Sequence, residues 1–363
     1  MQAQLPTRAL EPAAYTHDHE QLIVRRDDAT GLHAVIALHS TALGPAAGGC
    51  RRWTYVDERA AVRDALRLSE GMTYKNALAG IPFGGGKSVI LADDHAQPTR
   101  EQLALFGRWL NELEGRYITA EDVGMGVEQA QTLAQFTPHV SGLGQQGIGG
   151  DPSPKTAYGV FRGLLSAVRF KLGVERLNGV TVAVQGLGAV GWALCRHLHD
   201  AGAQLVVADI NQPRVDAAVQ RFAARAVSVE RIASLQVDVF APCALGGVIT
   251  EHLAHRLNVS VVAGAANNQL ACDAAGEVLA RRGIVYAPDF VINAGGVISV
   301  AHEHLMQTGY FAQAGAHAVD RWASGRIEDI APRLNHILQQ ARNEGRSTDA
   351  VAKEMALKVI AAG

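Results

Sequence analysis

Lys87 ends a glycine run in the stretch AGIPFGGGKSVIL, residues 79–91, where glycine, lysine and serine together suggest a phosphate-binding loop. Such a loop requires the spacing G-x-x-x-x-G-K-S/T, with a helix after it. Here Ile81 occupies the position of the first glycine, and the residues after Lys87, SVIL, have a strand pattern. The sequence therefore argues against phosphate binding and leaves Lys87 available for other chemistry.

Lys75, Lys87 and Asp122 lie near the ends of predicted elements in the first half of the chain. A lysine is solvated by default, so two lysines need a reason to converge on one site. An anion would hold one of them, while burial beside a second ammonium would lower the pKa of the other toward the range of a general base. We therefore predict an acid–base site in this half.

A second glycine motif lies in VAVQGLGAVGWALCRHL. Gly186, Gly188 and Gly191 form G-x-G-x-x-G between a predicted strand and a predicted helix. Such glycines permit a tight turn, close approach to a pyrophosphate and close helix packing. The next strand pattern ends at Asp209, 18 residues beyond Gly191, where a carboxylate can bind an adenosine ribose and repel a 2′-phosphate. We predict NAD rather than NADP; the alternative is a turn that only joins strand to helix.

The composition is that of an ordinary globular protein. The chain has 363 residues and a net charge of −2, which favours two domains and gives no basic surplus for a nucleic-acid partner. No apolar run reaches the roughly 18 residues of a membrane span. The N-terminal stretch lacks the pattern of a secretory signal.

Cysteine and histidine give no sign of a disulfide framework or a metal site. The four cysteines are Cys50, Cys195, Cys243 and Cys272. They lie far apart without CxxC spacing, which favours a reducing cytoplasm. The groups HDHE (17–20) and HEH (302–304) lack the HExxH spacing that places two imidazoles on one helical face. We expect both to be solvated surface and no metal to be bound.

Hydrophobic periodicity predicts the elements that carry these residues. In the first half it predicts a β-hairpin over 22–39, a helix over 59–74, a strand from 87, a helix from about 100 and a strand in RYITAEDVG. Lys75 should follow the end of its helix, and Thr99 with Gln102 forms a capping-box pattern. In the second half it predicts five short strands, at 180–185, 204–209, 237–242, 259–264 and 283–288.

Strands that alternate with helices predict a doubly wound parallel sheet. We expect an α/β protein with two domains and a cleft between them. Residues 1–145 would form an α/β substrate and oligomerisation domain, and 146–330 a Rossmann-type NAD domain, joined by a glycine- and proline-rich hinge over 141–156 that leads into a helix from about Thr156. The stretch from about 328 should be helical, with 330–363 folding back on the first domain.

Long blocks in a fixed order carry a family resemblance. They are GPAAGGCRRW, GMTYKNALAGIPFGGGKSVI, GRYITAEDVG, DPSPKTAYGV, VAVQGLGAVG, APCALGG, GAANNQL and YAPDFVINAGGVI, from about residue 40 to residue 300. In these blocks the chain resembles the amino-acid dehydrogenase family of glutamate, leucine, phenylalanine and valine dehydrogenases. The resemblance implies oxidative deamination of an amino acid to a 2-oxo acid and ammonia, with NAD as cofactor, in a homo-oligomer.

The resemblance also implies roles for the substrate-side residues. Lys75 would bind the substrate α-carboxylate, helped by backbone N–H groups near Gly48 and Gly49. Lys87 would be the general base that activates water against an imine, and Asp122 would shuttle protons. With a neutral lysine as base, deamination should work best at alkaline pH.

Four further residues are implied on the cofactor side. Thr156 would hold the nicotinamide carboxamide, and Ala241 would contribute to the cofactor site. Asn268, with Asn267, would hold either the nicotinamide ribose or the reacting amino group. The resemblance leaves open which of the two asparagines contacts the substrate.

The implied side-chain pocket consists of Ala47, Ala120, Val297 and Val300. It offers no cation for a glutamate side chain. Ala120 resembles leucine enzymes, whereas Ala47 departs from their bulkier leucine and deepens the pocket. We predict leucine and other branched-chain substrates, with a phenylalanine dehydrogenase as the alternative. A non-catalytic nucleotide-binding relative and a P-loop phosphotransferase are the other readings, and Lys75, Lys87 and Asp122 together argue against the former.

Overall fold

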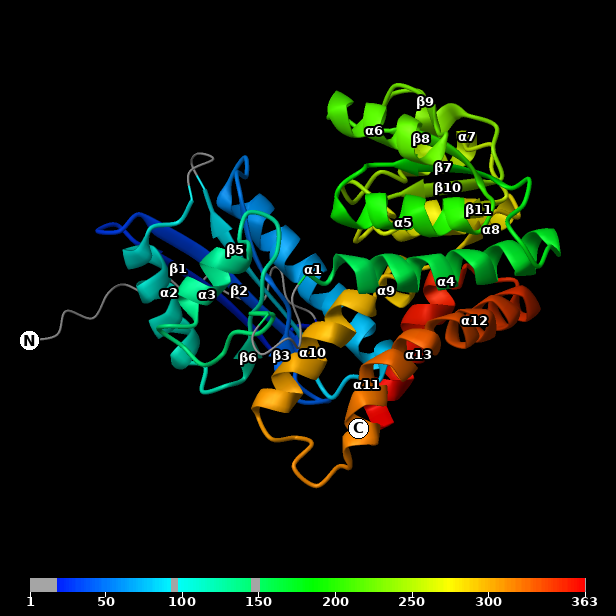
Figure 1. Cartoon of the computed structure of the whole chain (residues 1–363). Coiled ribbons are helices and arrows are strands. Elements are labelled where there is room, and N and C mark those ends of the chain that lie inside the picture. Colours follow the sequence, from blue (N-terminus) through cyan, green and yellow to red (C-terminus); the bar gives the residue numbers. More distant parts are fainter. Residues whose placement is uncertain (1–17, 93–96, 145–150, 363) are drawn as a thin grey trace, which may run out of the picture. The chain divides into compact units, whose positions relative to one another are not determined.

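The computed structural model describes residues 18–92, 97–144 and 151–362. Contacts within the chain divide it into two compact units. Unit 1 comprises Met1–Gly150, Val300–Ala312 and Ala356–Gly363, and unit 2 comprises Asp151–Ser299 and Gln313–Met355. In Figure 1, unit 1 is mainly blue to cyan, and unit 2 is mainly green to red.

A mixed sheet forms the centre of unit 1. Its strands follow the order β1 (Gln21–Asp27), β2 (Leu32–Ser40), β5 (Gly84–Leu91), β3 (Ala46–Ala47) and β6 (Tyr117–Ile118), and β4 (Cys50–Trp53) also pairs with β5. The predicted hairpin over 22–39 is confirmed, because β1 and β2 pair antiparallel. Asp27 closes its turn by accepting the amide of Thr30 at 2.8 Å.

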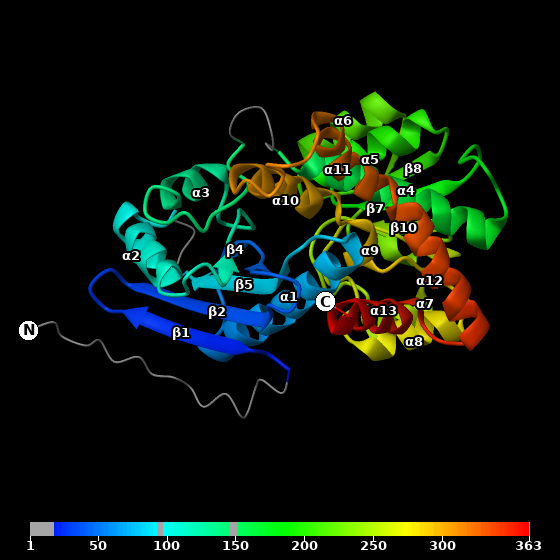
Figure 2. The same cartoon turned by 90° about the horizontal axis from the view of Figure 1, so that it is seen from below.

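Helices cover both faces of this sheet. On one face α1 (Glu58–Ala79) packs Ala61, Val62 and Ala65 against Val35 and Val89. On the other face lie α2 (Arg100–Asn111) and α3 (Val127–Leu133), side by side in Figures 1 and 2. Successive strand residues point to opposite faces, so β2 supplies both cores. The capping box predicted at the start of α2 is present.

The prediction that the first long helix ends before Lys75 is wrong. Helix α1 continues to Ala79 and ends where Gly80 adopts a left-handed conformation, with φ of 66°. Its last turns stay helical because they bury Tyr74, Asn76 and Ala77. Lys75 therefore lies within the helix, which gives its side chain a fixed origin.

The glycine run 84–86 is a strand, as its flanking pattern predicts, and it allows close packing. A Cβ on Gly84 would lie 1.9 Å from Ser40 O, one on Gly85 2.2 Å from Thr73 N, and one on Gly86 2.8 Å from the Tyr117 ring. Each of these positions excludes a side chain. The glycines that resemble a phosphate loop instead bring α1 and β2 against β5.

Unit 2 contains the parallel sheet that the sequence predicts. Its strands follow the order β12 (Val285–Tyr286), β11 (Val261–Val262), β10 (Val239–Pro242), β7 (Thr181–Gln185), β8 (Gln204–Ala208) and β9 (Arg225–Ala226), and all neighbouring pairs are parallel. The five predicted strands are all present, although β11 and β12 are only two residues long. Ala183, Phe240 and Val262 of this sheet lie in its buried core.

The helices outside unit 1's sheet follow one another along the rest of the chain. They are α4 (Ser153–Leu172), α5 (Ala189–Asp200), α6 (Gln212–Phe222), α7 (Glu251–Arg256), α8 (Asp273–Arg281), α9 (Asp289–Ile292), α10 (Gly295–Gln307), α11 (Ala316–Glu328), α12 (Ile330–Glu344) and α13 (Thr348–Ala362), with a 3-10 turn at Ile232–Ser234. Helix α4 begins at Ser153 rather than at Thr156, because Pro154 fits the first turn, where no intrahelical N–H is needed. Residues 145–150 of the predicted hinge lie outside the described residues.

The C-terminal helices follow the expected packing only in part. Helix α12 packs on α4 and α9 within unit 2, as Figure 1 shows, instead of on the first domain. The reason lies in α4, where Gly159 and Gly163 leave room that Ile330 and Leu334 fill. Helix α13 begins beside α8 (Figure 2), where Lys353 Nζ lies 2.7 Å from Asp273 Oδ1. Only the final residues, from Ala356, group with unit 1, together with 300–312.

Within the described ranges, no helix combines the length and apolar character needed to cross a membrane.

The contact between Gly85 and Thr73 gives a stability prediction. Gly85→Ala should destabilise the protein by about 1–3 kcal/mol, because the new Cβ must displace helix backbone. Gly325→Ala is the control: this glycine is exposed inside α11, and a Cβ there would meet none of the described part of the chain within 4 Å, so alanine should stabilise by about 0.5–1 kcal/mol. Denaturant unfolding of both variants checks this. Equal stability of Gly85→Ala and the natural chain would contradict the packing argument.

Candidate functional site

The structure brings Lys87 and Asp122 together. Lys87 lies on β5 and Asp122 in the loop after β6, and the Lys87 ammonium donates to Asp122 Oδ2. Their side chains are only 7% and 14% exposed, so this ion pair is largely removed from water. The other carboxylate oxygen accepts the Val123 amide at 2.7 Å. The predicted catalytic pair is therefore a buried, bonded unit.

Two cations determine the charge of Asp122. Burial alone would raise the pKa of this carboxyl, but Lys87 and Arg51 hold the pKa below its usual range. Asp122 is thus an anion at neutral pH, suited to accept and return protons from a neighbouring ammonium.

Gly48 and Gly49 place backbone directly against this pair. A Cβ on Gly49 would lie 2.4 Å from Glu121 O and 3.0 Å from the Asp122 Cβ, and one on Gly48 would lie 2.0 Å from Gly86 O. The amide of Gly48 donates to Ile118 O at 3.1 Å. The sheet therefore engages that amide, and the backbone N–H groups near Gly48 and Gly49 that would help to bind a carboxylate stay a prediction.

A buried tyrosine supports the same backbone from the other face of the sheet. Tyr117 OH donates to Gly48 O at 2.6 Å and lies 3.0 Å from Ser88 Oγ. Burial raises the pKa of Tyr117, so the phenol stays neutral. Tyr117 therefore fixes the strand segment beside Lys87 without adding charge.

Lys75 is also buried, with 9% of its surface exposed, so it is not a solvated surface group. The residues around it fix α1 on the sheet. Asn76 Nδ2 donates to Gly84 O at 2.6 Å, and Thr73 Oγ1 lies 2.8 Å from His39 Nδ1. All belong to unit 1, as do Lys87 and Asp122. The structure thus places the three predicted ionic residues in one unit, on α1, on β5 and in the loop after β6.

Part of the predicted side-chain pocket comes together around Gly142. A Cβ on Gly142 would lie 3.5 Å from Val300 Cγ2 and 4.0 Å from Ala120 Cβ. Ala47 is buried on β3 of the same unit. Val297 lies in the part of α10 that groups with unit 2. The residues that meet at Gly142 are small or apolar and uncharged.

The histidine group 302–304 is structural rather than solvated, which corrects the expectation from sequence; in the group 17–20, His17 lies outside the described residues, and Asp18 and Glu20 are exposed as expected. Glu303 is buried and accepts the amides of Leu143 and Gly144 at 2.9 and 3.1 Å, and His304 Nδ1 lies 2.9 Å from Ser141 Oγ. His19, in the first group, lies 3.0 Å from Ser69 Oγ. Among the described residues no cluster of histidine, cysteine or carboxylate side chains could hold a metal ion.

In unit 2 the glycine motif forms a tight turn at the start of α5. Gly186 has φ of 101° and donates its amide to Ala208 O at 2.8 Å. A Cβ on Gly191 would lie 2.0 Å from Gly186 O, whereas one on Gly188, at the helix N-cap, would meet no described residue within 4 Å. Two glycines therefore serve the turn and the third leaves open space at a helix N-terminus, which fits a pyrophosphate.

Asp209 is tied to that turn. Its Oδ2 accepts the Leu187 amide at 2.5 Å and its Oδ1 the Asn211 amide at 2.7 Å. The next residue, Ile210, is 92% exposed, although a large apolar side chain is usually covered. A carboxylate beside an exposed apolar surface matches the polar ribose and flat base of an adenosine.

Asn267 and Asn268 lie on a turn that a buried carboxylate organises. Asn268 has a left-handed backbone, with φ of 51°, and donates its amide to Asp289 Oδ2 at 2.8 Å. Asn293 Nδ2 donates to Asn267 Oδ1 at 3.0 Å. Tyr286 OH donates to the other oxygen of Asp289 at 2.5 Å. Asp289 therefore sets the position of Asn268, and Asn293 that of Asn267.

Thr156 and Ala241 differ in what they can offer a ligand. Thr156 is half-buried in the first turn of α4, and its Oγ1 lies 2.4 Å from the position of a Cβ on Gly296. Ala241 is fully buried in β10, so its side chain presents no surface. Beyond that strand, Ala244 N lies 2.8 Å from the position of a Cβ on Gly186.

Comparison with known proteins agrees with this geometry. Residues 19–139 match a family model described as the Glu/Leu/Phe/Val dehydrogenase dimerisation domain, and 208–362 match one described as Glutamate/Leucine/Phenylalanine/Valine dehydrogenase. A leucine dehydrogenase of Bacillus subtilis is 48% identical over 91% of this chain and 88% of its own length. The chain belongs to the Glu/Leu/Phe/Val dehydrogenase family.

A further relative extends the comparison to a solved structure. An L-tryptophan dehydrogenase of Nostoc punctiforme is 42% identical over 93% of this chain and 92% of its own. The crystal structure of L-tryptophan dehydrogenase from that organism matches with a TM-score of 0.77, at 39% identity, over 97% of this chain and 99% of the other. The predicted family and the two-part α/β fold with a Rossmann-type sheet are confirmed, and this chain is an amino-acid dehydrogenase.

Several residues that shape the site of this dehydrogenase are not predictable from sequence patterns. They are Arg51, Tyr117, Ile210, Asp289 and Glu303. Most act on groups far away along the chain: Tyr117 on Gly48, and Glu303 on Leu143. Hydrophobic periodicity carries no signal for such pairs. The position of Arg51 two residues after Gly49 in GPAAGGCRRW was the one available hint.

His39 gives a pH prediction for this dehydrogenase. Its ring is buried against Thr73 and 4.6 Å from the His19 ring, and burial, with help from His19, lowers the pKa of His39 below 6.5. The unfolded chain therefore binds a proton more readily than the native state, so stability is complete above about pH 6.5 and falls as the pH drops further. Denaturant midpoints at about pH 7.5 and 5.5 should differ less in His39→Gln than in the natural chain. The exposed His336→Gln control should keep the full difference.

Proposed function

We propose that this dehydrogenase catalyses the reversible, NAD-dependent oxidative deamination of L-leucine and other branched-chain L-amino acids to 2-oxo acids and ammonia. The observation that carries the proposal is the buried Lys87–Asp122 pair beside Gly49, in a chain 48% identical to a leucine dehydrogenase. General acid–base work needs such a pair within hydrogen-bond reach.

Lys87 and Asp122 divide the proton transfers between them. Lys87, when neutral, removes a proton from the water that adds to the substrate imine, and its ammonium is then already bonded to Asp122 Oδ2. Asp122 accepts that proton and returns one to the amino group that leaves as ammonia. Burial of the pair keeps other water away from these steps.

Lys75 supplies the positive charge for the substrate α-carboxylate. Its ammonium comes from a helix that Asn76 and Gly85 fix on the sheet, so the charge is held rather than mobile. A fixed cation orients the substrate Cα toward the reacting groups.

The residues of unit 2 fit a dinucleotide. Gly186, Gly188 and Gly191 would hold the pyrophosphate at the start of α5, and Asp209 with Ile210 the adenosine. Thr156 and the turn with Asn267 and Asn268 would orient the nicotinamide end. Bound NAD supplies the hydride acceptor for the substrate Cα–H bond. Asp209 supports NAD over NADP because its charge repels a 2′-phosphate.

The apolar side chains that meet at Gly142 support an aliphatic substrate. Ala120 and Val300 meet there, and neither could neutralise the carboxylate of a glutamate side chain. The small side chain of Ala47 favours a second candidate, a phenylalanine dehydrogenase with the same proton chemistry. One methylene changes discrimination by only about 1–3 kcal/mol, so several aliphatic amino acids should react.

Assembly and location are further parts of the proposal. A homo-oligomer is supported by the match of residues 19–139 to a domain described as a dimerisation domain. A cytoplasmic location is supported by the four free cysteines.

A substrate panel tests the function. The rate of NADH formation at about pH 10 should be high with leucine, isoleucine and valine, lower with phenylalanine and lowest with glutamate, since the alkaline pH favours a neutral Lys87. NADP in place of NAD should give a much lower rate. A profile dominated by phenylalanine would favour the second candidate, and no turnover despite NAD binding would refute the proposal.

Replacement of the base separates chemistry from binding. Lys87→Ala should lower kcat by about 10²- to 10⁴-fold while NAD affinity changes little, because the lysine acts on proton transfer. Lys171→Ala, an exposed lysine at the end of α4, is the matched control and should leave kcat unaltered. Steady-state kinetics and a fluorescence titration with NADH measure both quantities. Unaltered kcat in Lys87→Ala would disprove the role of this base.

A further inference from the structure

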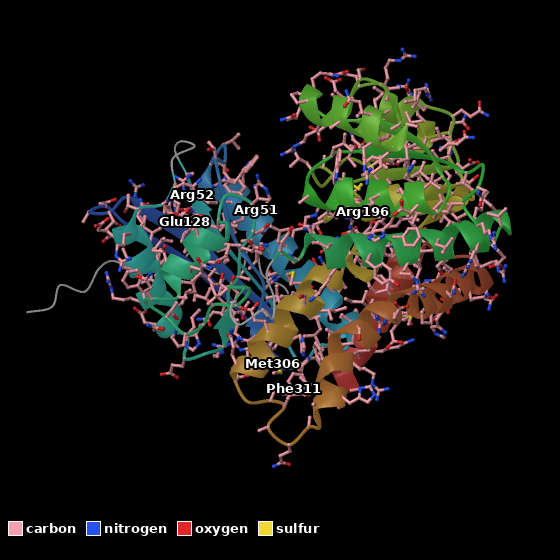
Figure 3. All side chains as sticks on the ribbon, in the orientation of Figure 1. Arg51, Arg52, Glu128, Arg196, Met306 and Phe311 are labelled. Atoms are coloured by element: carbon pink, nitrogen blue, oxygen red, sulfur yellow. The ribbon has the colours of Figure 1, made fainter. Side chains whose placement is uncertain are left out.

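Arg51 lies between two carboxylates at the edge of the site. Its Nη1 donates to Asp64 Oδ2 at 3.0 Å, and its Nε lies 3.8 Å from Asp122 Oδ2. Tyr55 OH donates to the same oxygen of Asp64 at 2.5 Å. The Arg51 side chain, labelled in Figure 3, is 19% exposed, and its Nη1 is held by Asp64 of α1. Its Nε faces Asp122, the carboxylate that pairs with Lys87.

Strand register places Arg51 on the same side of the sheet as Lys87. Strands β4 and β5 are parallel, and Arg51 pairs with Val89, two residues beyond Lys87. Residues two apart on a strand point to the same face. This is the face on which α1 packs, and α1 carries both Asp64 and Lys75. The arginine is therefore built into the acid–base site and is not a surface group that happens to lie nearby.

The Nε–H of Arg51 is buried and has no hydrogen-bond partner among the residues that the structure describes. The 3.8 Å to Asp122 Oδ2 exceeds hydrogen-bond length. A buried N–H without a partner destabilises a fold, so its presence next to a bonded ion pair needs a reason. In the present arrangement Lys87 occupies that oxygen of Asp122. The arginine N–H is thus one short movement from the acceptor that Lys87 holds.

The proposed function supplies the reason, and the inference rests on it. When Lys87 is neutral, Asp122 loses the charge of its partner and would remain as a buried anion without a cation. Arginine keeps its charge at every pH of interest. We propose that Arg51 is a positioning residue for the reaction: its guanidinium, anchored by Asp64, balances Asp122 while Lys87 is neutral and so favours the neutral lysine.

The thiol and the phenols around the site stay protonated under the alkaline conditions of the reaction. Burial raises the pKa of Cys50 to about 12 and also raises the pKa of Tyr55 and of Tyr117. Asp64 and Asp122 face Arg51 from α1 and from the loop after β6, and both are carboxylates. Lys75 is a further cation on α1, which also carries Arg59, Arg63 and Arg67. Removing the positive charge of Arg51 therefore favours the ammonium form of Lys87.

The test is the pH profile of kcat/KM for leucine deamination by the full-length enzyme. Arg51→Gln keeps a hydrogen-bond donor for Asp64 but removes the positive charge. The rising limb of the pH profile of this variant should therefore move to higher pH by about one unit. On that limb the rate should be about tenfold lower than in the natural enzyme. The two rates should converge at the alkaline end, because the base is then neutral in both.

Two further variants make the result specific. Arg52 is the neighbouring arginine, also labelled in Figure 3, and its side chain points to the opposite side of β4. Arg52→Gln should therefore leave the rising limb of the pH profile in place. Arg51→Lys keeps the charge without the fork that reaches both carboxylates, so its limb should move in the same direction by less. If Arg51→Gln does not fold, the displacement in Arg51→Lys decides.

The outcomes separate the inference from the function on which it rests. A loss of rate that is equal at every pH would show a structural role and overturn the inference, as would an unmoved limb. In both cases the natural enzyme still deaminates leucine, so the proposed function stands. If the natural enzyme turns over no amino acid, the function fails and the inference falls with it.

Discussion

The site of unit 1 depends on the close contact between helix α1 and strand β5. This contact exists because Gly85 has no side chain where Thr73 backbone passes, and because Gly84 and Gly86 likewise admit Ser40 and Tyr117. A helix packed this closely on a sheet places its own lysine, Lys75, in the same buried layer as the strand's lysine. The glycine run 84–86 therefore determines how close together the two buried lysines, Lys75 and Lys87, can lie.

Buried charge then imposes its own requirements. Lys87 is bonded to Asp122, and the cations of Lys87 and Arg51 outweigh the effect of burial on that carboxyl. Neutral groups complete the layer below: the phenol of Tyr117, whose pKa burial raises, fixes Gly48 without competing for protons. A site that must move a proton between a lysine and an aspartate benefits from neighbours that do not titrate.

In unit 2, carboxylates also fix the residues of the site, here by accepting hydrogen bonds from the backbone amides of turns. Asp209 accepts the amide of Leu187 in the glycine turn, and Asp289 accepts the amide of Asn268, whose backbone is left-handed. Each turn is therefore already ordered before a ligand binds, so binding loses little conformational entropy in these turns. Preorganised turns of this kind suit a cofactor that must present one face of its nicotinamide to the substrate.

The sequence by itself determined whatever depends on neighbours along the chain. The alternation of β7 to β12 with helices, the hairpin of β1 and β2, the capping box at Thr99 and the turn at Gly186 follow from local periodicity and local sterics. Only the tertiary structure decided the rest. It kept Lys75 inside α1, engaged the Gly48 amide in the sheet, buried Glu303, set α12 on α4 and placed Arg51 between Asp64 and Asp122. Those outcomes depend on which groups meet after distant segments pack, and a buried polar group takes the nearest partner that packing provides.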